Sequence, residues 1–329
     1  MLEVVVAITL LALVYDFGNG LNDAANAIST ITATRALTPR RAVILAAVGN
    51  FAGPFLLGTA VAATIGKGIV EATIIDSKVI IAAIVGAIFW TYLTTFKGLP
   101  ISITHSLVGG LMGAGIAKSG PAAIVATKVL TVILFIGGAP LLGFLGGLAF
   151  TVAIFWIFRK ARPSKVNEFF KKAQIISGSL YSLGHGANDA QNAMGIIAIT
   201  LLTSGYLGSE FYVPSWVIIL CASAMSLGTL MGGWKVVKTM GMKITKLRPV
   251  DGFCAETSGG LTLSLCTLAG IPVSTTHVIA GSIMGVGSTR SLSAVRWGVA
   301  RNIIWAWSLT IPVSMLVSAA TYFLASLFT

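Results

Sequence analysis

Two sequence blocks occur twice in this chain, in the same order and at nearly the same spacing, and this duplication constrains the fold most strongly. Residues 17–27 read FGNGLNDAANA and residues 183–193 read LGHGANDAQNA, with seven of eleven positions identical. Residues 99–115 read LPISITHSLVGGLMGAG and residues 271–287 read IPVSTTHVIAGSIMGVG, with eight of seventeen identical. Because the shared letters are mostly polar residues, proline and glycine, apolar composition alone does not produce the match. The chain therefore consists of two related halves.

The composition predicts that both halves lie in a membrane. Apolar residues make up 56% of the 329 residues and charged residues only 10%, whereas soluble domains carry about 25% charged residues. So few charges exclude a soluble enzyme, and so many apolar residues exclude a disordered chain. Since a spanning helix needs about 20 apolar residues, we expect an all-α polytopic membrane protein with broken helices, re-entrant hairpins and about 10–12 membrane segments.

Eight apolar stretches are candidate spans, and one of them is long enough for two. The stretches are Val4–Thr32, Ala42–Ile65, Val79–Phe96, Ala122–Phe158, Ile175–Leu202, Trp216–Trp234, Gly252–Leu268 and Gly298–Phe328. We expect Ala122–Phe158 to turn at residues 137–140 and to cross twice. The blocks at 99–117 and 271–287 are shorter, rich in glycine and opened by proline, which favours re-entrant hairpin arms over plain spans.

The net charge of +12 is concentrated in three basic stretches, Arg35–Arg41, Arg159–Lys172 and Lys235–Arg248. Positive residues collect at the cytoplasmic ends of membrane segments, so we expect all three stretches in the cytoplasm. Because the basic groups flank membrane segments and have no aromatic residues between them, they indicate contact with a lipid bilayer and not with nucleic acid.

Equivalent segments of the two halves are then expected to run in opposite directions. The first segment ends at the basic stretch 35–41, whereas its counterpart begins after the basic linker. We therefore predict a first inverted repeat over 1–158, a cytoplasmic linker over 159–172 and a second inverted repeat over 173–329, an arrangement common in secondary transporters. Both termini are expected outside the cell membrane. A parallel repeat with misassigned loops is the alternative.

Asp23 and Asp189 stand in the middle of apolar segments, where an ionised carboxylate costs about 2.5–3.5 kcal/mol on insertion scales. Both belong to a repeated polar set, and this repetition favours function over a plain contact between helices. The sets are Asn22, Asp23 and Asn26, and Asn188, Asp189 and Asn192. Spacings of three and four residues place each set on one face of a helix.

Glycines in front of these sets predict a break in each helix. Gly18 and Gly20 precede the first set, and Gly184 and Gly186 precede the second. A break would free backbone carbonyls, which membrane proteins tolerate where they line a cavity. Carbonyls, amide oxygens and a carboxylate together are the ligands that a hard cation prefers. Sodium fits this set, and a proton carried on the carboxylate fits nearly as well.

The second repeated motif is Pro-x-Ser-x-Thr-His, which is typical of a helix N-terminus. Its copies are Pro100, Ser102, Thr104 and His105, and Pro272, Ser274, Thr276 and His277, with Thr275 as an extra hydroxyl in the second copy. A helix N-terminus offers free N–H groups and a positive dipole end to an anion. The symmetric duplication favours two helix ends that clamp one oxyanion over plain capping. Both histidines are expected in the first turn, in a structural role.

Three polar residues break the symmetry between the halves. His185 stands where the first half has Asn19, and it is a candidate for titration or substrate contact. Glu256 lies in an apolar run and aligns with Ile84, which makes it a further functional candidate. Asn50 is expected to contact a neighbouring helix.

The repeated motifs resemble those of the inorganic phosphate transporter (PiT) family. The segments GLNDAANA, GANDAQNA, LPISITH and IPVSTTH carry the resemblance, which spans nearly the full chain and matches a short, prokaryotic-type member. The resemblance implies a secondary active transporter that takes up inorganic phosphate with sodium or protons and has no covalent cofactor. Some members carry sulfate, and animal members have Glu where this chain has Asn50, so ion stoichiometry stays open. A homodimer is expected from the family alone.

The residue patterns and the resemblance together give two sets of expected site residues. The coupling-ion set is Asn22, Asp23, Asn26, Asn188, Asp189, Asn192 and Glu256, with Na⁺ at Asp23, Asn26, Asp189 and Asn192. The substrate-binding set is Ser102, Thr104, Ser274, Thr275, Thr276, Asp23, Asp189, His185 and Gln191.

No Arg or Lys lies inside either repeated block, so phosphate is expected to be held by helix ends, hydroxyls and bound cations. The two carboxylates would repel an anion until cations neutralise them, which is a physical basis for coupling, with access alternating around a mid-membrane site. A sulfate or related oxyanion permease is the nearest rival, and a channel is a third class. A membrane-embedded phosphotransferase is remote, because an enzyme usually has one asymmetric nucleophile beside a base.

Overall fold

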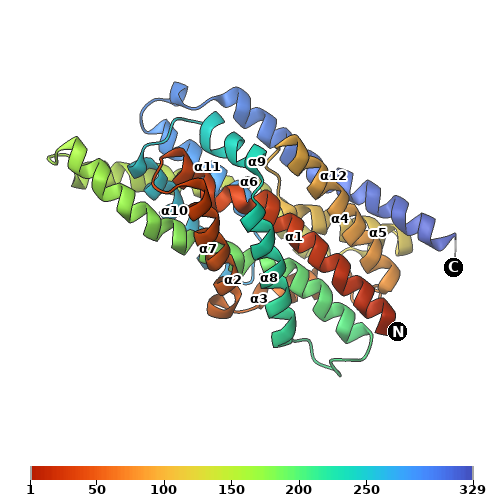
Figure 1. Cartoon of the computed structure of the whole chain (residues 1–329). Coiled ribbons are helices and arrows are strands. Elements are labelled where there is room, and N and C mark those ends of the chain that lie inside the picture. Colours follow the sequence, from red (N-terminus) through yellow and green to blue (C-terminus); the bar gives the residue numbers. More distant parts are fainter. Residues whose placement is uncertain (1, 328–329) are drawn as a thin grey trace.

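The structure is a computed structural model of the chain, described over residues 2–327 apart from the side chain of Lys67. The described residues form helices joined by short loops, with no strand among them (Figure 1). The helices are α1 (Leu2–Ala33), α2 (Pro39–Leu57), α3 (Ala60–Gly68), α4 (Ser77–Lys97), α5 (Ile103–Ser119), α6 (Ala126–Ile157), α7 (Pro163–Thr203), α8 (Ser215–Met231), α9 (Trp234–Lys238), α10 (Pro249–Leu268), α11 (Thr275–Ser288) and α12 (Trp297–Ser326). A π-helical turn, Thr239–Lys243, extends α9. The predicted all-helical fold class is confirmed.

Five of the described helices are long and apolar enough to cross a membrane: α1, α2, α4, α6 and α12. A sixth candidate is the pair formed by α8 and residues 234–243, which bends by 62° at a short break. The two motif-bearing helices are shorter, with 17 residues in α5 and 14 in α11. A length of about 20 residues is needed to span, so both suit the expected hairpin arms.

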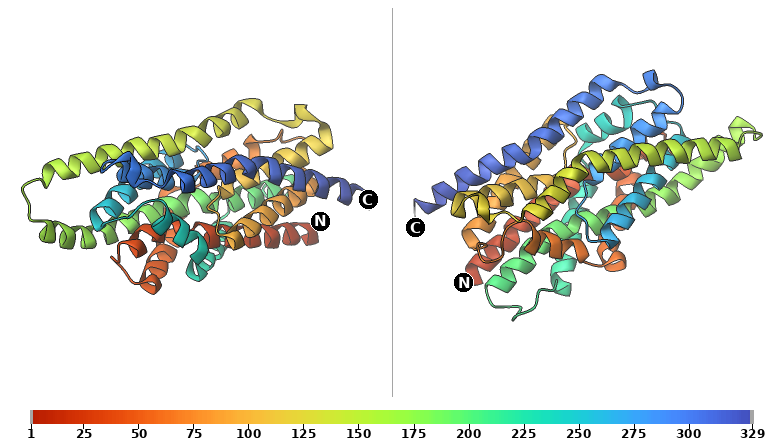
Figure 2. Two further views of the ribbon diagram at one scale, coloured as in Figure 1. Left: turned by 90° about the horizontal axis from the view of Figure 1, so that it is seen from above. Right: turned by 180° about the vertical axis from the view of Figure 1, so that it is seen from behind.

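The order of helices repeats along the chain, and the halves interlock. α5 packs along α12 of the other half, and α11 packs along α6 in the same way. Likewise α2 packs along α7, and α8 along α1. Corresponding helices run in opposite directions: α1 against α7 in Figure 1, and α6 against α12 in Figure 2. Each contact that a helix of the first half makes with the second half therefore has an equivalent contact in the reverse sense. The centre of the molecule is built from helices of both halves.

The predicted break at the glycines of α1 and α7 is wrong, because both helices continue through them. The glycines instead allow close packing. A Cβ on Gly20 would collide with the backbone of Met225, and one on Gly186 would collide with the backbone of Asn50. The helices break elsewhere, at Gly58 between α2 and α3 and at Gly232 between α8 and α9, where φ is +79° and +66°.

The predicted turn at residues 137–140 is also wrong, because α6 is one helix of 32 residues with Pro140 inside it. Apolar surroundings offer no alternative partners to backbone groups, so a membrane helix continues through Gly and Pro. The carbonyl of Pro140 instead meets Gly281, where a Cβ would not fit. The polar stretch 159–172 is likewise mostly helical, since α7 begins at Pro163.

Candidate functional site

Two carboxylates from different halves meet at the centre of the molecule. Asp23 on α1 and Asp189 on α7 are both 1% exposed. The hydroxyl of Thr275, the first residue of α11, donates to Asp189 Oδ2 at 2.9 Å and to Asp23 Oδ2 at 3.4 Å. Thr276 Oγ1 donates to Asp23 Oδ1 at 3.1 Å. The start of α11 therefore holds both predicted carboxylates, and we call these four residues with His185 the central cluster.

His185 completes a group that could hold a metal ion. Its Nε2 lies 3.4 Å from Asp189 Oδ2 and 3.9 Å from Asp23 Oδ2, and one ligand atom from each of the three residues lies within 4.8 Å of the others. Its Nδ1 is 2.9 Å from Asn50 Oδ1, and Asn50 Nδ2 donates to Thr229 Oγ1 at 2.9 Å. Asn50 thus makes the expected contact between helices, and it orients the imidazole toward the carboxylates.

Two asparagine–threonine bonds cross between the halves in equivalent positions. Asn26 Nδ2 on α1 donates to Thr276 Oγ1 at the start of α11, at 2.9 Å. Asn192 Nδ2 on α7 donates to Thr104 Oγ1 at the start of α5, also at 2.9 Å. Each long helix therefore binds the motif-bearing helix of the opposite half. The two sequence motifs, far apart in the chain, form one site.

A second pair of bonds anchors each long helix within its own half. Asn22 Nδ2 donates to Thr95 Oγ1 at 2.7 Å, and Asn188 shares a hydrogen bond of 2.9 Å with Thr267. Thr95 and Thr267 occupy the last turns of α4 and α10. The predicted ion residues Asn22 and Asn188 thus act first as helix anchors, directly beside the carboxylates in the chain.

The helices α5 and α11 begin at the predicted serines and face each other. Ser102 Oγ accepts from the backbone N–H of His105 at 3.1 Å, and Ser274 Oγ accepts from that of His277 at 3.2 Å. The two imidazole rings meet edge to face, with centroids 5.0 Å apart. Both histidines lie in the first turn, as predicted. Two helix N-termini and their positive dipole ends therefore point into one buried region.

A pair of tyrosines positions these helix starts, and the sequence analysis missed it. Tyr15 Oη donates to the carbonyl of Ile103 at 3.0 Å, and Tyr181 Oη donates to that of Thr275 at 3.3 Å. Both tyrosines are buried. They are separated by the same 166 residues as the two Asn-Asp blocks, so extending the repeat by two residues would have found them.

Unpartnered oxygens surround the central cluster. The side-chain amides of Asn19, Asn22, Asn26 and Asn192 are fully buried and donate hydrogen bonds, yet their Oδ1 atoms have no partner. Buried acceptors are normally satisfied, so each such atom needs an explanation. An amide whose nitrogen is used in a hydrogen bond and whose oxygen is free has an oxygen available to coordinate a cation. Oxygen ligands of this kind suit a hard ion.

Glu256 and Gln191 lie apart from the central cluster. Glu256 on α10 accepts from Thr30 at 2.6 Å and from Gln174 at 2.8 Å through Oε1, and from Ser177 at 2.5 Å through Oε2. Gln191 binds backbone at the break between α2 and α3: it accepts from the Ala62 N–H at 2.9 Å and donates to the carbonyl of Gly58 at 2.8 Å.

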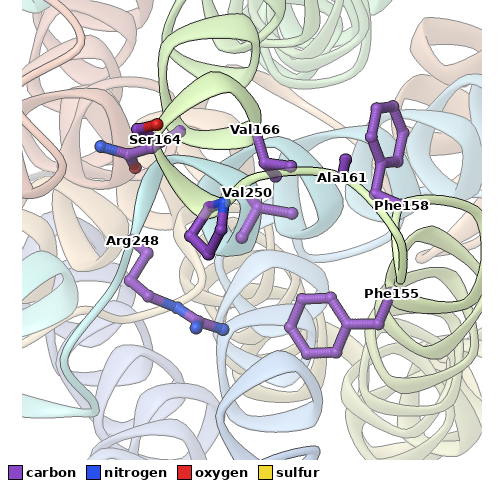
Figure 3. Close-up of a pocket in the computed structure, with 9 residues that line it drawn as sticks. Phe155, Phe158, Ala161, Ser164, Val166, Arg248 and Val250 are labelled. Atoms are coloured by element: carbon purple, nitrogen blue, oxygen red, sulfur yellow. The ribbon is translucent and has the colours of Figure 1, made fainter.

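Two surface pockets are separate from the central cluster. One of about 270 Å³ reaches Glu256 and Ser177 beside Gly184 and Gly260. Another of about 530 Å³ lies where α6 meets α7, with Phe155 and Phe158 on one side and Arg248 on the other (Figure 3). Neither pocket touches Asp23 or Asp189, which are enclosed by protein.

Comparisons with known proteins agree with this architecture. Residues 19–318 match the phosphate transporter family. A probable low-affinity inorganic phosphate transporter of Rhizobium meliloti (strain 1021) is 52% identical over 98% of this chain and 96% of its own length. A protein of the same description from Bacillus subtilis (strain 168) is 41% identical over 99% of this chain and 98% of its own.

A solved structure, described as the sodium-dependent phosphate transporter, superposes with a TM-score of 0.89 at 29% identity, covering 99% of this chain and 100% of its own. The matching family and relatives are transporters and not enzymes, so a phosphotransferase is set aside. With apolar helices long enough to span, the protein is a multi-pass membrane protein. Its sequence and its fold agree, and the chain belongs to the phosphate transporter family.

Proposed function

We propose that this protein takes up inorganic phosphate by symport with sodium. The observation that carries the proposal is the meeting of two helix N-termini, from α5 and α11, at a buried pair of carboxylates ringed by unpartnered amide oxygens. Helix ends and hydroxyls suit an oxyanion, and carboxylates with amide oxygens suit a hard cation. The similar solved structure is that of a sodium-dependent transporter, which supports sodium as the driving ion.

Sodium is assigned to Asp23, Asn26, Asp189 and Asn192. The free Oδ1 atoms of Asn26 and Asn192 supply neutral oxygens, and Asp23 and Asp189 supply the charge. Two carboxylates that share Thr275 cannot both stay ionised in a dry interior without counter-charge. Bound sodium ions would supply that charge.

Phosphate is assigned to the starts of α5 and α11. The first N–H groups of a helix have no partner within the helix. Ser102, Thr104, Ser274, Thr275 and Thr276 would add hydroxyl groups beside them, and His185 a ring nitrogen. Among the side chains that the structure describes, no ion pair brings a Lys or Arg to the central cluster, so the cations themselves must offset the carboxylates before an anion binds. That order of binding couples the two fluxes.

Alternating access then requires the two halves to move around the central cluster. We propose the inverted arrangement of 1–158 and 173–329, with the stretch 159–172 in the cytoplasm and both termini outside. The opposite directions of α1 and α7 support it (Figure 1). Thr30 lies two helical turns after Asp23 on α1, and it donates a hydrogen bond to Glu256. We assign Glu256 to the coupling ion on the cytoplasmic side. Gln191, which holds the break between α2 and α3, reaches substrate only if that break rearranges.

The test is uptake of labelled phosphate into proteoliposomes with and without an inward sodium gradient, at fixed pH. We expect uptake that needs sodium and resists excess sulfate. Uptake that follows a pH gradient alone would move the coupling to protons. Full suppression by sulfate would make the protein a general oxyanion permease, and uptake that does not saturate or need a gradient would make it a channel.

A further inference from the structure

A third buried carboxylate lies on α1, outside every role assigned so far. Asp16 is fully buried and stands seven residues before Asp23. At a rise of 1.5 Å per residue, two turns separate them by about 10 Å along the same helix face. The counterpart of Asp16 in α7 is Ser182, so the carboxylate belongs to one half only.

Asp16 has far fewer partners than its burial requires. Its Oδ1 accepts one long hydrogen bond, 3.4 Å from Asn19 Nδ2, and its Oδ2 has no partner. Among the described residues no ion pair includes it. The charged group that acts on it is another carboxylate, Asp189, and its other titratable neighbours, Tyr15 and Cys221, bring no positive charge. A buried carboxylate without counter-charge is costly, and one that persists in a membrane segment normally has a function.

Asn19 supplies the second half of a binding site. It lies one turn along α1 from Asp16, and its amide nitrogen also donates to the backbone carbonyl of Asp189 at 3.3 Å. Its Oδ1 is fully buried and unpartnered, like Oδ2 of Asp16. Two unpartnered oxygens, one of them charged, thus lie on adjacent turns. A protein group that donated hydrogen bonds here would have satisfied them, whereas a cation needs them free.

We infer that Asp16 and Asn19 form a separate site for a monovalent cation, which binds there on its way to the central cluster. This inference rests on the proposed sodium symport. One carboxylate balances one positive charge, so a monovalent ion leaves the buried site neutral while a divalent ion does not. Asn19 joins the new site to Asp189 through its backbone, which places the site next to the central cluster. In the proposed orientation, Asp16 faces the outside and Glu256 the cytoplasm.

The first experiment counts sodium ions bound to the purified full-length protein, by equilibrium binding of labelled sodium without phosphate. Asp16→Asn keeps the shape of the side chain and removes its charge. We expect this variant to bind one sodium fewer per chain than the unaltered protein, Asp16→Glu to keep that ion, and Ser182→Ala to bind the full number. Asp23→Asn should lose sodium from the central cluster and keep the ion at Asp16.

The second experiment measures phosphate uptake against sodium concentration. In Asp16→Asn we expect the sodium concentration for half-maximal uptake to rise about tenfold, because a site that loses a negatively charged ligand binds a cation more weakly. At saturating sodium, the phosphate concentration for half-maximal uptake should be unchanged. If Asp16→Asn binds and uses sodium like the unaltered protein, the Asp16 carboxyl is a protonated structural group and the inference is wrong. If the unaltered protein binds no sodium at all, the proposed symport is wrong, and the inference that rests on it is wrong as well.

Discussion

The helices α1 and α7 share their central residues and differ on both sides of them. The shared bonds are equivalent: Asn26 to Thr276 matches Asn192 to Thr104, both at 2.9 Å. The buried polar residues of α1 outside the shared set are Asp16, Asn19, Ser29 and Thr30, and their counterparts in α7 are Ser182, His185, Gly195 and Ile196. The comparison separates a symmetric centre from an asymmetric path. We interpret the centre as the place where substrate and ions meet, and α1 as the helix along which cations approach and leave.

The ends of the motif-bearing helices show the same contrast between shared position and different environment. Lys118 on α5 pairs with Asp76 at the start of α4, with Nζ 2.7 Å from Oδ2. Arg290, just past α11, pairs with Asp251 in the first turn of α10, with Nη2 3.2 Å from Oδ2. Lys118 and Arg290 are equivalent by the 172-residue offset. The first link has a half-exposed carboxylate, whereas Asp251 is fully buried. Both halves therefore have an ion pair at this position, and the two pairs differ in the burial of the carboxylate.

The symmetric centre predicts the largest effect. Asp23→Asn and Asp189→Asn should each lower sodium-driven phosphate uptake by about 100-fold, because a buried hydrogen bond to a charged group contributes up to about 3 kcal/mol and each carboxylate also supplies charge. Proteoliposome uptake measures this, with Asp76→Asn as a control that removes a carboxylate elsewhere. Full activity in both variants would contradict the assignment, and loss in one alone would break the symmetry.

The asymmetric path predicts a smaller effect at Glu256. Glu256→Gln should reduce uptake about tenfold. The amide takes the charged acceptor away from all three donors and leaves at least one of them facing an NH2 group, and a buried unsatisfied donor costs about 1–3 kcal/mol. Sodium binding at the central cluster should persist, which equilibrium binding would detect. Ser264→Ala is the matched control, since Ser264 lines the same pocket without bonding to Glu256. Equal uptake in the two variants would remove Glu256 from the path.

Much of this architecture was predictable because the duplicated letters are polar. Asp23, Asn26, Asp189, Asn192 and the hydroxyls of the second motif were identified from the repeat, and the structure brings most of them together. Asp16 and Tyr15 escaped, because each lies just outside the block that was aligned. The partners of Glu256 escaped as well, since contacts between α1, α7 and α10 leave no periodic pattern in the sequence.

The helix breaks were misplaced for a different physical reason. A glycine in a membrane helix permits either a bend or a close approach, and the sequence does not distinguish them. Gly18 and Gly184 lie in continuous helix, whereas Gly58 and Gly232 adopt positive φ between helices. What decides is the neighbour across the interface. Gly228 lies against the backbone of Phe17, a contact that becomes visible only once α1 and α8 are packed.

The two asparagine–threonine bonds between the halves predict a third, smaller effect, which tests whether the halves contribute equally. Double-mutant cycles for Asn26 with Thr276 and for Asn192 with Thr104, each residue changed to Ala, should give similar coupling energies of about 1 kcal/mol, or roughly fivefold in uptake. The readout is sodium-driven uptake at low phosphate. A clearly larger coupling for Asn26 would follow if the additional bond to Thr275 at 3.2 Å matters, and would show that the two halves contribute unequally.

The smallest expected effect lies at the exposed ion pair between Lys118 and Asp76. Burial of the Asp76 carboxyl raises its pKa, but the hydrogen bonds from Lys118 and from the Val79 N–H outweigh burial and hold the pKa below its ordinary value of 3.8. A carboxyl whose pKa is lower in the folded state stabilises the fold at higher pH, and this contribution is lost as the pH falls through the lowered pKa. Since the side chain is 44% exposed, solvent screening limits the contribution to about 0.5–1 kcal/mol.

Thermal unfolding in detergent, scanned from pH 6 to about pH 3, measures this contribution as a difference between variants. Asp76→Asn should unfold slightly earlier than the unaltered protein at pH 6, and the gap should close toward pH 3. Glu210→Gln removes another exposed carboxyl and is the control, with no gap expected. A gap that stays constant with pH would mean that Asp76 acts as a neutral helix cap through its bond to Val79, at 2.9 Å, and that the ion pair with Lys118 adds nothing. The link between α5 and α4 would then depend on hydrogen bonding alone, whereas the corresponding link between Arg290 and Asp251 is an ion pair with a buried carboxylate.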